Sequence, residues 1–207
     1  MKSLIKMSQA VAAASLLFIS ATAVAVPITT LYSTGVDDSG APLSLGANEQ
    51  HYEIVAGSPS IFTPVVTSNS AYMPSNASSS WISLPSGLSS ATYQTTFDLT
   101  GFDVSSASLD LKIAVDNTMT DVLINGASTG FSIAIGYPAF QSWSNLTVSS
   151  NFLAGVNTLQ FLAVNSGGPG AFRVEASGNA AAVSEPGAGV LFGLGLMGLA
   201  MTRKRKA

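Results

Sequence analysis

The chain has 207 residues, of which 47% are hydrophobic and only 9% are charged, and its formal net charge is −3. This length allows one sandwich-sized domain together with processing segments. Cysteine is absent and histidine occurs once, at His51. The composition therefore excludes thiol nucleophiles, disulfide frameworks and Cys/His zinc sites.

The charges are distributed unevenly along the chain. Six of the eight basic residues lie within the first six or the last five positions. Between Val26 and Val183 there are only two bases, Lys112 and Arg173, against ten acidic residues, which gives this segment a formal net charge of −8. Because so acidic a surface repels phosphate backbones, no nucleic acid partner is expected.

Residues 1–25 have the organisation of a signal peptide. Two lysines stand within the first six residues, and an apolar run follows at residues 10–19. Ala23 and Ala25 provide the small residues that signal peptidase requires, so cleavage is predicted before Val26. An uncleaved anchor or a buried core helix is the alternative interpretation.

The segment that follows predicts an all-β domain. Residues 93–99 and 109–115 alternate strictly between apolar and polar side chains, which is typical of strands with one buried face. Strands are expected at residues 93–99, 109–115, 121–124, 131–135, 159–164 and 172–176. The core is expected to contain Phe97, Leu111, Ile113, Val115, Leu159 and Phe161.

Turn signals separate these strands, and no amphipathic helical run lies among them. Asn125-Gly126 is the strongest short hairpin signal. Short strands at this spacing favour an antiparallel β-sandwich at residues 48–178. Residues 26–47 are expected to form a loose N-terminal flank, and residues 179–187 a linker that includes the sorting motif described below.

One hairpin carries oxygen ligands suited to Ca²⁺. Asp116, Asn117 and Asp121 flank its strands, and carboxylate and amide oxygens are the donors that calcium prefers. The same residues also favour turns for backbone reasons, and this interpretation is preferred. The sequence therefore predicts no cofactor, with Ca²⁺ as the alternative.

Two further groups of residues could take part in ligand binding or catalysis. Trp81, Tyr137 and Trp143 could form a platform on which sugar rings stack, or could be used for packing. His51 and Glu53 share one face of an expected strand, but no G-x-S-x-G elbow accompanies them. No catalytic residues are predicted, although the acidic residues leave a glycosidase with paired carboxylates as an alternative.

The C-terminal residues combine an apolar segment with a basic end. Residues 188–202 form a glycine-rich stretch of fifteen residues, about 22 Å long as a helix. Residues 203–207 follow as a basic tail, and its four bases are expected to stop translocation and to stay in the cytoplasm. These stop-transfer residues are Arg203, Lys204, Arg205 and Lys206.

The layout of residues 184–207 resembles the PEP-CTERM sorting signal of Gram-negative bacteria that make exopolysaccharide. In that family a Pro-Glu-Pro motif precedes an apolar helix and a basic cluster. Glu185 and Pro186 match the motif, and Ser184 replaces its first proline. The resemblance implies export with signal peptidase and an exosortase-type enzyme as partners, a transient inner-membrane intermediate, and a final location on the cell surface or outside the cell.

A second resemblance concerns the domain itself. Asp121–Gly126, Phe140 and the stretch Phe152–Leu159 are similar to jelly-roll, galactose-binding-like domains attached to glycosidases. The expected architecture is therefore a jelly-roll sandwich flanked by an N-terminal signal helix and a C-terminal hydrophobic helix. The expected function is that of a non-catalytic surface or matrix protein associated with exopolysaccharide or biofilm. A secreted carbohydrate-active enzyme and a purely structural coat protein remain the alternatives.

Overall fold

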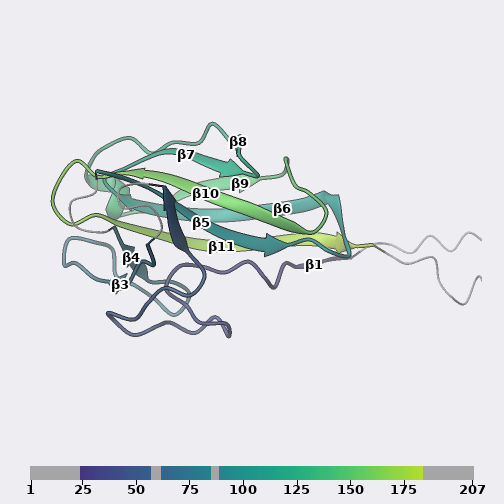
Figure 1. Cartoon of the computed structure of the whole chain (residues 1–207), viewed down its shortest axis with the longest axis horizontal. Coiled ribbons are helices and arrows are strands. Elements are labelled where there is room, and N and C mark those ends of the chain that lie inside the picture. Colours follow the sequence, from purple (N-terminus) through teal and green to yellow (C-terminus); the bar gives the residue numbers. More distant parts are fainter. Residues whose placement is uncertain (1–23, 57–61, 85–88, 184–207) are drawn as a thin grey trace, which may run out of the picture.

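The computed structural model describes residues 24–56, 62–84 and 89–183 and shows two antiparallel sheets (Figure 1). One sheet contains β1 (Ala25–Pro27), β3 (Val66–Thr67), β4 (Trp81–Ser83), β6 (Phe102–Asp116), β9 (Ser144–Val148) and β11 (Ala171–Ala182). The other contains β2 (Glu53–Ala56), β5 (Ser90–Asp98), β7 (Thr118–Ile124), β8 (Ala127–Ser128) and β10 (Val156–Val164). A single 3₁₀ turn, η1 (Tyr137–Phe140), completes the elements of the described ranges.

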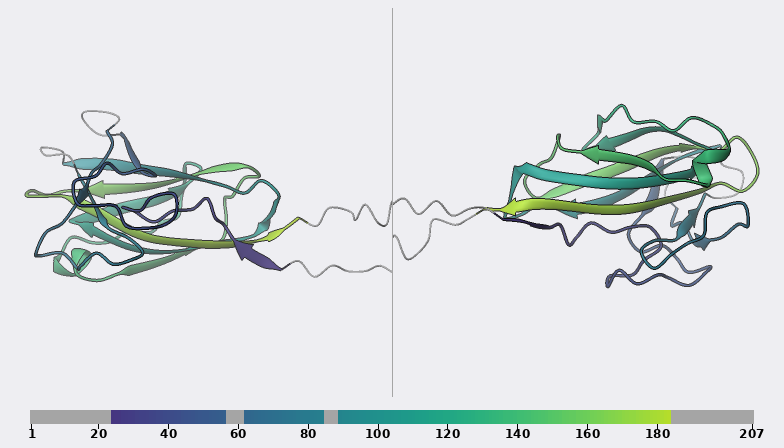
Figure 2. Two further views of the ribbon diagram at one scale, coloured as in Figure 1. Left: turned by 90° about the horizontal axis from the view of Figure 1, so that it is seen from below. Right: turned by 180° about the vertical axis from the view of Figure 1, so that it is seen from behind.

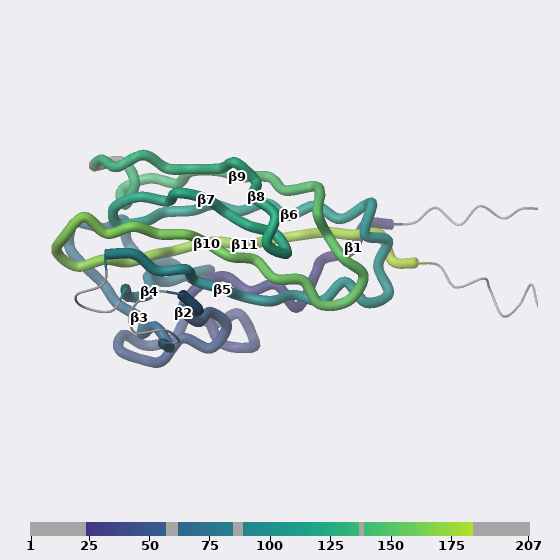
Figure 3. Tube along the Cα trace, turned by 45° about the horizontal axis from the view of Figure 1, so that its top comes forward, coloured from purple at the N-terminus to yellow at the C-terminus, as the bar shows by residue number. Residues whose placement is uncertain are grey.

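The strand order identifies the architecture as a jelly-roll sandwich. The six-stranded sheet has the order β3–β4–β11–β6–β9, with β1 also paired to β11, and the five-stranded sheet has the order β2–β5–β10–β7–β8. From β4 to β11 the chain crosses to the opposite sheet at every connection except the β7–β8 hairpin (Figure 3). Such alternation between two sheets is typical of a jelly roll. The predicted all-β antiparallel fold is confirmed.

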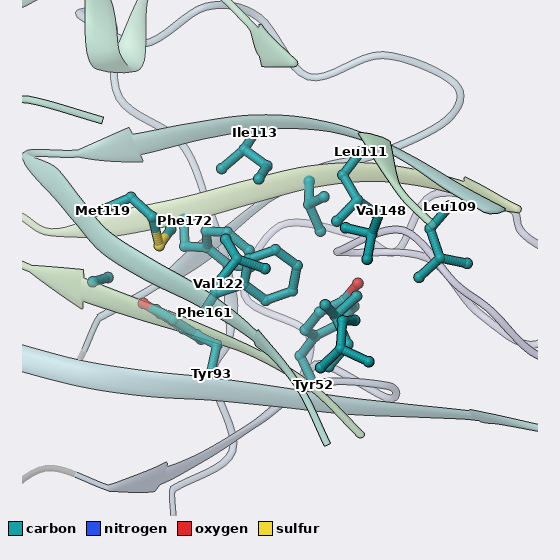
Figure 4. Packing of buried hydrophobic residues seen from close by; sticks show 14 of the residues in the cluster. Tyr52, Tyr93, Leu109, Leu111, Ile113, Met119, Val122, Val148, Phe161 and Phe172 are labelled. Atoms are coloured by element: carbon teal, nitrogen blue, oxygen red, sulfur yellow. The ribbon is translucent and has the colours of Figure 1, made fainter. Parts of the chain in front are cut away.

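The hydrophobic core lies between the two sheets. All six residues expected there are at most 2% exposed. Around them, Phe172 contacts the rings of Phe161 and Tyr93 at centroid distances of 4.7 and 4.8 Å (Figure 4). Because these three rings come from β11, β10 and β5, they join both sheets at the centre of the sandwich.

The expected strand at residues 131–135 is not formed. Only Ile133 pairs, through an isolated bridge to Met119, and Ile135 is exposed. Gly130 and Gly136 flank the segment with positive φ angles of 73° and 154°, so the chain leaves the sheet on both sides. The short strand β8 pairs with β7 instead.

The expected N-terminal flank is part of the domain. Residues 28–36, which we call the strap, run along the edge of β11 between β1 and β4. Ile28 N donates to Gly178 O at 2.9 Å, and Thr34 N donates to Val174 O at 3.1 Å. Four strap side chains are buried, those of Ile28, Leu31, Thr34 and Val36. Because the strap satisfies backbone groups of β11, residues 26–47 do not form a loose flank.

The last strand also extends further than expected. β11 continues to Ala182, whereas a linker was predicted from residue 179. Ala25 of β1 pairs with Ala181, so the first and last described strands lie side by side at one end of the sandwich (Figure 2). The predicted sorting motif, hydrophobic helix and basic tail lie outside the described residues, and so does the predicted signal peptide, apart from Val24 and Ala25. Within the described ranges, no helix has the length and apolar character needed to span a membrane.

Candidate binding groove

The outer face of the six-stranded sheet carries a groove with a polar floor. Strand alternation directs six side chains outward at its centre, two from each of β6, β9 and β11. The register places Lys112 between Asn145 and Glu175, and it places Asp110 between Thr147 and Ser177. Ser33 of the strap and Ser78 also line this hollow of about 380 Å³.

Glu175 is the most strongly hydrogen-bonded residue of the groove. Its carboxylate accepts hydrogen bonds from Asn76 Nδ2 at 2.7 Å and from Lys112 Nζ at 3.2 Å. Partial burial acts to raise the pKa of Glu175, but these hydrogen bonds and the charges of Lys112 and Arg173 together lower it below its ordinary value. Glu175 is therefore an ionised acceptor rather than a proton donor.

Both bases of the described residues lie at the groove: Lys112 lines it, and Arg173 lies directly beside it. Arg173 is fully buried, and its Nη2 lies 3.7 Å from Glu175 Oε1. Lys112 keeps 55% of its side chain exposed. Asp110, which accepts a hydrogen bond from Thr147 Oγ1 at 2.7 Å, is the second acidic residue. Two positive and two negative groups thus balance at this site, within a segment whose net charge is −8.

Trp143 lies beside the start of β9 and is half-buried. The guanidinium carbon of Arg173 lies 4.7 Å from the centre of its ring, which is a cation–π contact. The same guanidinium donates from Nε to Ser79 Oγ at 2.8 Å and from Nη1 to Pro74 O at 2.7 Å. These contacts fix the position of Arg173 next to the groove and occupy one face of Trp143.

Of the three aromatic residues that could form a platform or be used for packing, Trp81 is packed. Trp81 is only 1% exposed, because the preceding loop places the Tyr72 ring 4.6 Å from it. The Trp81 indole also donates to Met73 O at 2.8 Å, as a packed tryptophan does. The side chain of Tyr137 lies outside the described part of the structure. Of the three residues, Trp143 is therefore the one that the structure places next to the groove.

The hairpin carboxylates are held by neighbouring donors. Asp116 accepts hydrogen bonds from the Tyr72 hydroxyl at 2.9 Å and from the Asn117 amide. Burial raises the pKa of Asp116, against the opposing effect of the Tyr72 hydrogen bond. Asp121 accepts from Ser128 Oγ and from Val122 N. No group of three or more His, Asp or Glu side chains is placed to hold a metal ion within the described ranges.

His51 lies on the other side of the molecule and stacks on a tyrosine. The His51 and Tyr32 rings are 3.7 Å apart with an interplanar angle of 3°. His51 lines two shallow hollows along β5, and its Nε2 lies 3.8 Å from Asp38 Oδ1. Beside it, buried Glu49 accepts from the backbone N–H groups of Gly35 and His51, and burial raises its pKa although these bonds oppose the shift. This arrangement joins the strap to the start of β2.

The fold and the C-terminal sequence together indicate that this chain is an exported β-sandwich protein. Residues 182–206 match the PEP-CTERM protein-sorting motif, which confirms the resemblance found in the sequence. The motif places the protein on the cell surface or in the extracellular space. No curated protein sequence matches the chain.

Several solved structures are similar to this chain at low sequence identity. A CBM35 from Paenibacillus barcinonensis is 15% identical with a TM-score of 0.35, covering 55% of this chain and 87% of that chain. The CBM35 from Cellvibrio japonicus Abf62 is 12% identical with a TM-score of 0.40, covering 65% and 89%. A GH31 alpha-xylosidase from Xanthomonas citri is 9% identical with a TM-score of 0.30, covering 78% and 19%.

Proposed function

We propose that this protein is a non-catalytic component of the cell surface or extracellular matrix, and that its sandwich binds neutral segments of exopolysaccharide. The observation that carries the proposal is the charge-balanced polar floor of the groove. Hydroxyl groups of a sugar both donate and accept hydrogen bonds, and the floor offers donors at Lys112 and Asn145 beside acceptors at Glu175 and Asp110. A biofilm role would follow from such binding.

The ionisation of Glu175 favours binding over hydrolysis. Glycosidases that use two carboxylates need a general acid whose pKa is raised. The pKa of Glu175 is lowered instead, and its carboxylate is held by Asn76 and Lys112. A carbohydrate-active enzyme is thus the second candidate function. A turnover assay with the polysaccharides that bind distinguishes an enzyme from a non-catalytic binding protein. Release of reducing ends that Glu175→Gln abolishes would establish the enzyme.

Asn145→Ala is expected to weaken polysaccharide binding about fivefold without changing the melting temperature. Asn145 is exposed and no side-chain hydrogen bond holds it, so its amide is available to a ligand. Loss of one hydrogen bond corresponds to about 1 kcal/mol of binding free energy. A glycan array identifies the ligand, and isothermal titration measures the dissociation constant of each variant.

Thr96→Ala is the matched control, because Thr96 is exposed on the outer face of the five-stranded sheet. If Thr96→Ala loses binding and Asn145→Ala keeps it, the polysaccharide binds in the hollows near His51 and not in the groove. Binding to a neutral glycan should also be equal at low and high salt, since no net charge is neutralised. A strong salt dependence would contradict the neutral-ligand proposal.

We further propose that the protein passes through an inner-membrane intermediate and is then released from its C-terminal tail. Fifteen glycine-rich residues are fewer than the roughly 20 of a stable membrane-spanning helix. Protein from the cell exterior is therefore expected to begin at Val26 and to end near Ser184–Pro186.

Mass spectrometry tests both ends of this secreted protein. Because no base lies between Arg173 and Arg203, trypsin produces a C-terminal peptide that starts at Val174. This peptide should stop before Ala188. Recovery of the same peptide extended through Met201 would show that the tail persists as a permanent anchor.

A further inference from the structure

One end of the sandwich gathers the first and last described residues. Val26 pairs with Ala180 in the β1–β11 ladder, and Val183 N donates to Gly101 O at 2.8 Å. The same end contains the loop that precedes β10, since Leu99 N donates to Gly155 O at 2.8 Å. In Figures 1 and 2 this is the end from which β1 starts and at which β11 stops.

This end also carries most of the exposed apolar side chains. Of the seven large hydrophobic residues that are exposed in the described ranges, five lie here. One of them, Val24, precedes the predicted cleavage site, and we call the other four the apolar end: Val26, Leu153, Val156 and Val183. The other two, Leu45 and Ile135, lie elsewhere. Clustered apolar exposure of this kind marks an interaction surface, whereas isolated exposed residues do not.

Side-chain hydrogen bonds hold the loop that carries Leu153 in a defined conformation. Asn157 is fully buried, and its amide oxygen accepts from Leu153 N at 2.7 Å. Its amide nitrogen donates to Leu153 O at 2.9 Å and to Gly155 O at 2.8 Å. Leu153, with 55% of its surface exposed, is therefore held outward by a specific hydrogen-bond network.

The length of the chain beyond β11 determines how far this surface can lie from a membrane that holds the apolar tail. Five residue steps separate Val183 from Ala188, where the apolar tail begins, and they span at most about 17 Å when fully extended. The headgroup regions add roughly 5–8 Å to each side of the hydrocarbon core. With the tail inserted, Val183 and its neighbours therefore reach no further than the bilayer surface and the layer just above it.

We propose that the apolar end rests on the lipid bilayer surface while the tail is inserted. This inference rests on the inner-membrane intermediate proposed above. The strands run away from this end, so the groove on the outer face of the six-stranded sheet remains open to polysaccharide. The apolar end thus orients the domain before the sorting enzyme releases it.

The charges at this end select the kind of lipid. Asp98 pairs with Val156 and Asp103 pairs with Ala181, and the side chain of Asp103 is exposed whereas Asp98 is half-buried. The two bases of the described residues, Lys112 and Arg173, are both engaged at the groove. The α-amino group that cleavage before Val26 leaves at this end adds one positive charge, so the two carboxylates still make the end net negative. The surface therefore suits zwitterionic headgroups better than anionic ones.

Depth-dependent fluorescence quenching tests the proposal on the signal-cleaved chain, residues 26–207, reconstituted into phosphatidylcholine vesicles with brominated acyl chains. Three variants are compared: Leu153→Trp at the apolar end, Ile135→Trp as an exposed control elsewhere, and Phe192→Trp in the tail. The wild-type signal of Trp81 and Trp143 is subtracted. The fluorescence added at positions 153 and 192 should be quenched, and that at position 135 should not. Vesicles containing phosphatidylglycerol should quench position 153 less at low salt.

Each outcome bears on a different claim. Quenching at position 192 but not at 153 would overturn the resting surface while leaving the inserted tail intact. Absence of quenching at both positions would overturn the membrane intermediate itself. Equal quenching at 153 and 135 would show a domain without fixed orientation, which also contradicts the proposal. Polysaccharide binding is measured separately and is unaffected by any of these results.

Discussion

Replacing Phe161 with alanine is expected to lower the free energy of unfolding by about 3–5 kcal/mol. Phe161 is fully buried on β10, the middle strand of the five-stranded sheet. Its ring lies 4.7 Å from that of Phe172 and 6.3 Å from that of Tyr52. Truncation removes a large apolar surface and leaves a cavity at the point where the two sheets meet, so both effects add.

Urea denaturation of the mature protein, followed by tryptophan fluorescence, measures this loss. Val156→Ala is the control on the same strand, since Val156 is 66% exposed and its truncation removes almost no buried surface. It should change the free energy of unfolding by less than about 0.5 kcal/mol. A loss below about 1 kcal/mol for Phe161→Ala would contradict the central position assigned to this ring.

The core was predictable because strand alternation is a local property of the sequence. Residues 93–99 and 109–115 alternate so regularly that the inward positions follow directly, and the structure buries Phe97, Leu111 and Ile113 as expected. The same reasoning failed at residues 131–135. There the alternation is present, but flanking glycines with positive φ angles turn the chain away from the sheet.

The groove was not predictable because it depends on register between distant strands. Lys112 and Glu175 are 63 positions apart, and Asn76 and Glu175 are 99 positions apart. The rarity of bases between Val26 and Val183 was visible in the sequence. Only the pairing of β6 with β11 shows that both bases belong to one site.

The burial of Trp81 also lay beyond sequence reasoning. An aromatic residue on a short strand has the same local pattern whether its outer side meets solvent or a loop. Here Tyr72, from the loop before β4, covers that side and bonds Asp116 through its hydroxyl. The loop consists of turn-forming residues without a periodic apolar pattern, so its course over Trp81 could not be predicted from the sequence.

Gly35→Ala is expected to destabilise the protein by about 2–5 kcal/mol, which would show that the strap belongs to the domain. Gly35 has a φ of +69°, a left-handed conformation that costs an alanine about 1–2 kcal/mol. A Cβ at this position would also lie 2.5 Å from Ser80 Cβ, and such overpacking costs about 1–3 kcal/mol more. The strap would be displaced from β4 and β11, and with it Ser33, which lines the groove.

Gly40→Ala separates the two contributions to this loss. Gly40 has a similar φ of +80°, but nothing lies within 4 Å of the position where its Cβ would stand. It should therefore show only the backbone cost of about 1–2 kcal/mol. Urea denaturation of both variants measures the difference, which represents the contact between the strap and Ser80. Equal losses would mean that Ser80 moves aside without cost, which would contradict the tight packing of the strap against Ser80. Because Ser33 moves with the strap, Gly35→Ala should also weaken polysaccharide binding more than Gly40→Ala does.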